Sequence, residues 1–197
     1  TRVLSSGNSY SGGTILNSGV VQPGAASSLG SGSVTVASGA NVSPATGGIT
    51  IPNAFTLSGT GNALQAGALR FLHSGDNLSG PITLGADASL TGLYNIMSGT
   101  IDLGSFTLTD AKNAGVSDNW SAMISGAGGL TMAGANATNS VLTLSGANSY
   151  TGPTTLTSGE LNVSVANNLG DPAANLVFNG GTLGITGLSK SQVSVMA

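Results

Sequence analysis

The carboxylates are the side chains of this 197-residue chain that could most readily do chemistry. Paired acids with Arg or Lys nearby, and sometimes Ca²⁺, can bind or cleave polysaccharides. No two of the seven acids lie within three residues of each other, so solvated surface acids are expected. Asp102 could still face solvent from a strand and meet an acid that only the fold brings near. The acids are Asp76, Asp87, Asp102, Asp110, Asp118, Glu160 and Asp171.

Nucleophilic, metal and cofactor chemistry have little support. His73 is the single histidine and precedes Ser74, but serine is so abundant that a Ser–His pairing is uninformative. The chain has no Cys, which excludes disulfides and thiolate ligands. The Ca²⁺-binding G-G-x-G-x-D repeat and the phosphate-binding fingerprints are missing too. We therefore expect no enzyme activity, no catalytic, cofactor-binding or metal-binding residues, and no cofactor.

Composition restricts the partners. Charged residues make up 6% of the chain, against about 25% in ordinary domains. Net charge is −3, and the four basic residues are too few and too scattered to bind nucleic acid or an anionic membrane. No apolar run is long enough to insert as a membrane-spanning helix. The basic residues are Arg2, Arg70, Lys112 and Lys190.

The elements that must position these side chains are short strands. Many triplets place a small or polar residue between two apolar ones, so both apolar side chains share one face. Gly, Ser, Asn and Pro between the triplets supply turns. Residues 110–119 read as a loop, and Trp120 after them is expected to fill the core. The triplets include Val34–Val36, Ile49–Ile51, Phe55–Leu57, Ile101–Leu103, Phe106–Leu108, Leu130–Met132, Leu142–Leu144, Leu161–Val163, Leu183–Ile185 and Val193–Val195, and Arg2–Leu4 reads as a further strand.

Internal repeats indicate the fold. The segment beginning Leu4-Ser5-Ser6-Gly7-Asn8-Ser9-Tyr10 matches the one beginning at Leu144 at a constant offset of 140 residues. A degenerate copy beginning at Ser74 aligns with Ser6 at an offset of 68. The copies lie near 4–36, 74–103 and 124–178 within one domain, 1–197, or a segment of a longer one.

Such short units cannot close a core alone, but stacking them can. We expect an all-β fold, a right-handed parallel β-helix (β-solenoid) of about ten rungs, where a rung is one full winding. At roughly 20 residues a rung and about 4.8 Å between rungs, the rod would be roughly 45 Å long.

The repeated polar residues have structural interpretations. Asn8 and Asn148 lie at Gly-flanked turns, where an Asn side chain can bond its own backbone. Tyr10 and Tyr150 are expected to pack their rings on a neighbouring rung and keep the hydroxyl in water. Thr at the centre of triplets should line the outer face.

The stretch Ile124-Ser125-Gly126-Ala127-Gly128-Gly129-Leu130-Thr131, followed by Leu142 to Gly152 and then Ser158-Gly159-Glu160-Leu161, resembles the autotransporter passenger-associated β-strand repeat. The resemblance covers residues 124–170 and 4–30, and residues 67–90 are similar to a degenerate variant. Residues 132–140 depart from the family pattern, which predicts a loop off one rung. The resemblance implies a β-helix outside the cell that supports adhesion, surface layers or appended domains, with no catalytic residues to carry over.

The leading hypothesis is a non-catalytic, extracellular or cell-surface bacterial protein that forms a stiff shaft or a self-assembling filament. Open strand edges would stack head to tail on copies of itself, or continue into more of the same polypeptide. The alternatives are a passenger adhesin that binds glycans or surfaces and, third, a polysaccharide-degrading β-helix enzyme.

Overall fold

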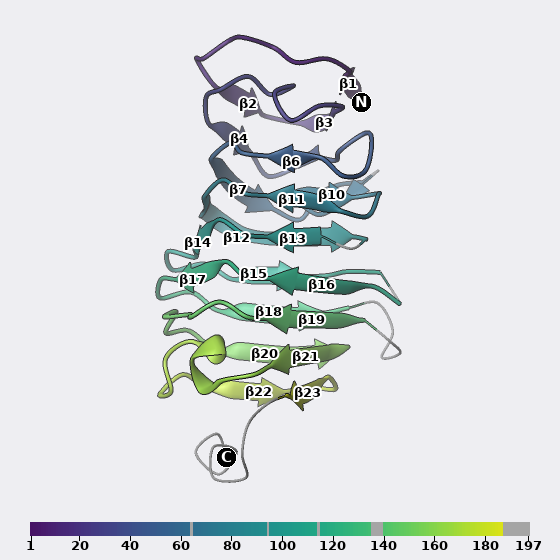
Figure 1. Cartoon of the computed structure of the whole chain (residues 1–197). Helices are drawn as coiled ribbons and strands as arrows, with labels where there is room; N and C mark the ends of the chain where they lie inside the picture. The colour runs from purple at the N-terminus through teal and green to yellow at the C-terminus, as the bar shows by residue number, and fades with distance from the viewer. Residues whose placement is uncertain (64, 94, 114, 135–139, 187–197) are drawn as a thin grey trace.

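The chain folds into a stack of parallel β-rungs, shown by a computed structural model that describes residues 1–63, 65–93, 95–113, 115–134 and 140–186. Figure 1 shows the rungs piled from β1 at one end to β23 at the other. Three parallel strand ladders run along the stack, and two of them share the long strand β12. The predicted parallel β-solenoid is confirmed.

The first ladder contains nine strands and so makes eight steps from one rung to the next. This gives about eight windings, close to the ten expected. Its strands are β1 (Arg2–Leu4), β3 (Gly19–Pro23), β5 (Ala40–Val42), β10 (Leu69–Phe71), β12 (Ile82–Gly92), β15 (Leu108–Asp110), β18 (Leu130–Ala133), β20 (Thr154–Ser158) and β22 (Leu176–Phe178).

The other two ladders form the remaining walls. The second consists of β2 (Thr14–Leu16), β4 (Val34–Val36), β7 (Phe55–Gly59), the first part of β12, β14 (Thr100–Asp102) and β17 (Met123–Ser125). The third consists of β6 (Thr50–Ile51), β11 (Asp76–Leu78), β13 (Asn95–Met97), β16 (Ser117–Trp120), β19 (Val141–Leu144), β21 (Glu160–Val163) and β23 (Thr182–Ile185). A short 3-10 helix, η1 (Ala166–Leu169), follows β21.

The number of rungs falls below ten because some rungs are longer than the expected length of about 20 residues. Arg2 pairs with Val21, 19 residues on, whereas Val42 pairs with Leu69, 27 residues on. The long rung carries an antiparallel hairpin of β8 (Gly61–Asn62) and β9 (Gln65–Ala66). Buried Asn41 donates to the Gly67 carbonyl at 2.5 Å, which fastens this hairpin to the wall.

The core is made of inward ladders of apolar side chains, as the triplets predicted. One ladder runs through five rungs, and all its members are at most 2% exposed: Val34, Phe55, Ile82, Ile101 and Ile124. Trp120 lies in another ladder between Met97 and Leu144 and is fully buried, so its predicted core role is confirmed. Thr35, Thr56 and Thr83 pair in register on the outer face, also as expected.

Two local predictions were wrong. Phe106 lies in a turn, where its N–H donates to the Leu103 carbonyl at 2.9 Å, and the strand begins only at Leu108. Residues 110–119 are not simply a loop, because Asp110 ends β15 and β16 begins at Ser117. The apolar alternation was hidden there because charged side chains occupy inward positions.

Other predictions fall partly or wholly outside the described residues. The strand at Arg2–Leu4 is confirmed as β1, whereas Val193–Val195 lies outside the described part. Of the predicted loop 132–140, Met132 and Ala133 belong to β18, and residues 135–139 lie outside the described part. Within the described residues, no helix has the length and apolar character needed to cross a membrane.

Candidate functional site

The exposed acids are dispersed, and three of them accept a hydrogen bond from a backbone N–H. Asp87 accepts a hydrogen bond from the Thr107 N–H at 2.8 Å, and Asp102 accepts one from the Gly104 N–H at 2.9 Å. Asp171 accepts one from Ala173 N–H at 2.8 Å. Asp102 does face solvent, but its register neighbours are Thr83 and Ser125 rather than an acid. The paired-acid arrangement of a polysaccharide-active site is therefore not formed at Asp102.

His73 lies on the surface, as expected, while Asp76 three residues later is 1% exposed. Asp76 accepts a hydrogen bond from the Ile49 N–H at 3.0 Å. Burial raises the pKa of Asp76, although that bond and the nearby His73 oppose the shift. Asp76 was expected on the surface and is instead an inward residue of β11, two positions from buried Leu78.

Asn148 links three consecutive rungs. Its side-chain oxygen accepts from the Ile124 N–H at 2.8 Å, and its amide donates to the Asn168 carbonyl at 2.6 Å. The prediction that this Asn bonds its own backbone was wrong, because its side chain is buried between rungs and replaces strand pairing there. At the equivalent position in the first copy, Asn8 donates to the Ser28 carbonyl at 2.7 Å and is exposed.

Tyr150 differs from the prediction at its hydroxyl. Its ring packs against Gly170 of the next rung, as expected, because both Cδ atoms of the ring lie 3.1 Å from the position that a Cβ at Gly170 would take. Its hydroxyl is fully buried and bonds the Thr154 hydroxyl at 2.6 Å. Burial raises the pKa of Tyr150 to about 12. The equivalent Tyr10 is 40% exposed and bonds the Thr14 hydroxyl at 2.8 Å.

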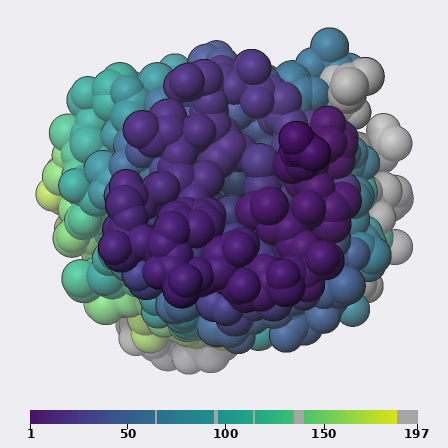
Figure 2. Space-filling model, turned by 90° about the horizontal axis from the view of Figure 1, so that it is seen from above, coloured from purple at the N-terminus to yellow at the C-terminus, as the bar shows by residue number. Residues whose placement is uncertain are grey.

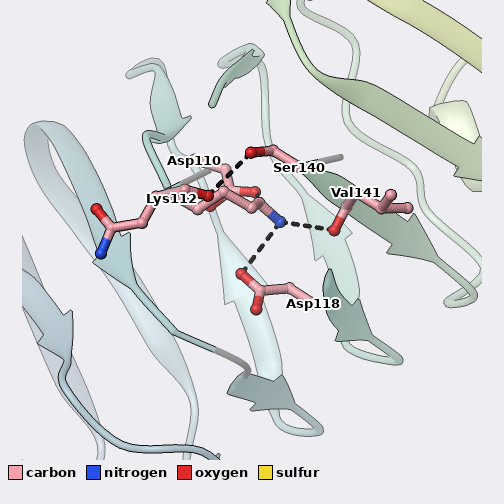
Figure 3. Close-up of polar contacts among 6 residues, drawn as sticks. Asp110, Lys112, Asp118, Ser140 and Val141 are labelled. Carbon is pink, nitrogen blue, oxygen red and sulfur yellow. Dashed lines mark hydrogen bonds and ion pairs between the residues drawn. The ribbon is translucent and has the colours of Figure 1, made fainter. Parts of the chain in front are cut away.

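The most unusual polar group is buried in the wall between β15 and β16. The Lys112 ammonium lies 2.7 Å from Asp110 and 3.1 Å from Asp118, and all three side chains are at most 1% exposed. Lys112 also donates to the Val141 carbonyl of the next rung at 3.0 Å (Figure 3). We call these three side chains the Lys112 cluster.

Electrostatics make the Lys112 cluster chemically distinctive. Burial raises the pKa of Asp110 to about 6; Lys112 opposes that shift, and the charge of Asp118 adds to it. A carboxyl group with such a pKa can both give and take a proton near neutral pH.

Sequence reasoning missed the Lys112 cluster because it treated Asp110 and Asp118 as surface acids and Lys112 as an isolated base. Asp110 pairs with Leu90 and Met132, and Asp118 pairs with Leu142, so both acids stand in inward ladders. The alternation of residues along the strand could have indicated the burial of Asp118, because Val116, Asp118 and Trp120 share one buried face.

A small pocket lies beside η1 and β22, and its lining includes Ala166, Leu169, Asp171 and Leu176. In the parts of the chain that the structure describes, no three His, Cys or acidic side chains come together to hold a metal ion.

The described ends of the stack expose strand edges and apolar side chains. Among the described strands, β1 pairs only with β3, and β22 only with β20. Val3 is 55% exposed, and Phe178 is 56% exposed although its partner Leu156 is fully buried. Figure 2 looks onto the N-terminal end of the stack, where bluer atoms of later rungs can be seen between the purple atoms.

Comparison with known proteins identifies the repeat. The family model of the passenger-associated-transport-repeat matches residues 1–22 and 139–163. No curated protein and no solved structure matches the chain. The two matched segments contain the equivalent pairs Asn8–Tyr10 and Asn148–Tyr150, which occupy the same positions in their rungs. The predicted resemblance is thus confirmed: the two matched segments, within a parallel β-solenoid, support an autotransporter passenger repeat family.

Proposed function

We propose that this chain is a non-catalytic shaft of an autotransporter-type bacterial passenger, secreted or held at the cell surface. The observation that carries the proposal is the unbroken stack of parallel ladders in which the passenger repeats are embedded. Each rung covers the apolar face of its neighbour, so bending the rod would separate buried ladders. A stiff spacer that holds other domains away from a cell is the task that such a rod performs best.

The strand edges give the shaft its means of extension. An unpaired edge can accept another parallel strand, and apolar residues in the last described rung can cover a following rung. We infer that the edges pair with further solenoid, either in the same polypeptide or in a second copy stacked head to tail. Repeated head-to-tail contacts of one kind lead to a filament.

Shape and assembly test this proposal directly. Negative-stain electron microscopy and small-angle scattering of the purified chain should show an elongated particle, and light scattering should show growth with concentration. Compact particles would overturn the proposal that the chain forms a shaft. Elongated particles that do not associate at any concentration would overturn stacking between copies and leave continuation within one polypeptide.

A charge at an open edge should prevent stacking. Val3→Lys places an edge lysine on β1 and is expected to reduce the scattering growth several-fold. The matched control is Met123→Lys, because Met123 is 50% exposed on a side wall rather than at an end. Equal effects of the two substitutions would point to nonspecific association.

Location and catalysis are separate tests. Antibodies raised against the purified chain should label intact bacteria or their culture medium, and labelling that requires lysed cells would overturn an extracellular role. Incubation with common acidic polysaccharides should release no new reducing ends. Depolymerisation by the purified chain would show that it is an enzyme.

Adhesion is the second candidate, and one wall favours it. On the outer face of the third ladder, polar side chains stand in register from rung to rung: Thr50, Asn77, Asn119, Thr143 and Asn162, with Ile96 among them. Regularly spaced amide and hydroxyl groups suit the hydroxyls of an extended glycan. A glycan array should show binding that Asn119→Ala weakens, and an array without signal would remove this candidate.

A further inference from the structure

The Lys112 cluster holds an amine within ion-pair distance of two carboxyl groups. The Lys112 Nζ atom lies 2.7 Å from Asp110 Oδ2 and 3.1 Å from Asp118 Oδ2. The side chain of Lys112 is held in place by its bond to the Val141 carbonyl at 3.0 Å. The neighbouring Ser140 hydroxyl donates to the Asn113 carbonyl at 2.9 Å, which fastens the segment that carries Lys112 to the next rung (Figure 3). The three groups are therefore held within ion-pair distance of one another, with the amine beside both carboxyl groups.

The surroundings of the Lys112 cluster favour neutral groups over charged ones. The acids are flanked in their ladders by Leu90, Met132 and Leu142. One ammonium and two carboxylates lie away from water, where ionised groups are costly to bury. Amide formation between Lys112 and Asp118 removes one buried ammonium and one buried carboxylate, so that only Asp110 can still ionise there, and burial favours the protonated form of Asp110.

We propose that Lys112 and Asp118 are joined by an intramolecular isopeptide bond, which the folded chain forms by itself with Asp110 as the proton carrier. Asp110 takes a proton from the Lys112 ammonium, and the free amine attacks the Asp118 side-chain carbon. The new C–N bond forms as one C–O bond breaks. Two of the three ammonium protons leave with that oxygen as water, one of them through Asp110, and no oxidant or cofactor is needed.

The division of roles follows from the positions of the two acids. Asp110 makes the shorter contact with the amine, and burial raises its pKa to about 6, so it can accept a proton and return it. Asp118 lies on the next strand, β16, so an amide to it ties two walls of one rung together. An amide to Asp110 would only close a loop within three residues.

Such a bond would give the rod a covalent staple. The chain has no Cys and so cannot form a disulfide. An amide between side chains resists both reduction and oxidation, and would hold the β15–β16 corner closed when neighbouring rungs separate. This inference does not depend on the proposed shaft function, because it concerns bond formation within the folded chain.

Mass spectrometry of the purified, denatured protein tests the bond. The intact mass should be lower than the sequence mass by one molecule of water. Trypsin cleaves after Lys and Arg, so an unmodified chain yields the peptides 71–112 and 113–190. The isopeptide blocks cleavage at Lys112 and leaves one peptide, 71–190, whose fragmentation should place the link at Asp118. A full sequence mass with both shorter peptides would overturn the proposal.

Variants separate the roles of the three residues. Lys112→Arg keeps the positive charge and the trypsin site, and it should show the full mass and both peptides. Asp118→Asn should still form the amide but release ammonia, reaching the same final mass as the wild type. Asp110→Ala should keep the full mass while its circular dichroism remains β-type. A link that survives in Asp118→Ala would overturn the assignment of the acceptor, and the wild-type digest decides the bond itself even if a variant fails to fold.

Discussion

At the scale of single residues, Asn148 shows how a polar side chain can serve as core. Two of its bonds satisfy backbone groups in the rungs on either side, at Ile124 and Asn168. Asn168 continues the link by donating to the Gly146 carbonyl at 2.8 Å. The buried side-chain amides of Asn148 and Asn168 lie one above the other at a corner between two walls. There they bond the backbone groups that no strand pairing satisfies.

Replacing Asn148 should therefore be costly. Asn148→Ala leaves a buried N–H and a buried carbonyl without partners, and we expect the free energy of unfolding to fall by about 2–4 kcal/mol. Urea denaturation followed by circular dichroism measures this. The matched control is Asn8→Ala in the other repeat copy, where the side chain is exposed and the expected loss is below about 1 kcal/mol. Equal losses would contradict the bridging role.

Asp76 should make stability depend on pH. Its pKa is raised by burial above the ordinary 3.8, opposed by the Ile49 and Gly48 N–H groups and by His73. Just above pH 3.8 the folded state therefore holds a proton that the unfolded state has already lost, so the contribution of Asp76 to stability is full below pH 3.8 and is lost as pH rises through the raised pKa.

Asp76→Asn tests this sign, because Asn keeps an oxygen for the Ile49 N–H but does not ionise. As pH rises from 4, melting temperatures of the wild type should fall relative to those of the variant. Asp87→Asn is the control, since Asp87 is exposed. If the melting temperature of the wild type instead rose with pH relative to that of the variant, the hydrogen bonds to Asp76 would outweigh its burial.

At the scale of elements, close contact between rungs is set by glycine at the corners. Gly170 has a φ of +79° and lies against Tyr150, so a Cβ there would collide with the Tyr150 carbonyl oxygen. Gly39 has a similar φ of +87°, but no described atom lies within 4 Å of the place where its Cβ would be.

This pair separates backbone strain from rung contact. Gly39→Ala should cost about 1 kcal/mol, the penalty of a left-handed conformation alone. Gly170→Ala carries the same penalty and must also push the Tyr150 rung away, so we expect a loss of more than about 3 kcal/mol. Thermal and urea unfolding of the two variants measures the difference. Similar losses would mean that the rungs can separate locally at little cost.

At the scale of the whole molecule, stability should be graded along the stack. Each rung contacts only its neighbours, so the described end rungs are stabilised from one side and the central rungs from both. In native-state hydrogen exchange, amides of β12 and β15 should exchange at least tenfold more slowly than those of β1 and β2. The buried strand β20, nearer the other end, provides an intermediate comparison. Uniform exchange along the chain would indicate one global unfolding unit.

Much of the architecture could be predicted because its signals are local. Alternation within triplets such as Val34–Val36 determines which side chains face inward, and the 140-residue repeat shows that the units are stacked. Phe106 was assigned wrongly because a local apolar pattern does not distinguish a strand from a turn that packs against the next rung. The number of rungs was overestimated in part because the β8–β9 hairpin adds about seven residues to one rung, and these residues show no strong apolar pattern.

The candidate site was decided by tertiary structure alone. By itself, the sequence determined a β-solenoid with an apolar interior and a polar surface, because residue parity and repetition suffice for that. Which acids are buried depends on register between rungs about 20 residues apart. That register, together with the bond from Lys112 to Val141, brings Asp110, Lys112 and Asp118 into one enclosed cluster. Spacing along the chain could not show this, because charged residues in inward positions are stable only when the fold supplies their partners.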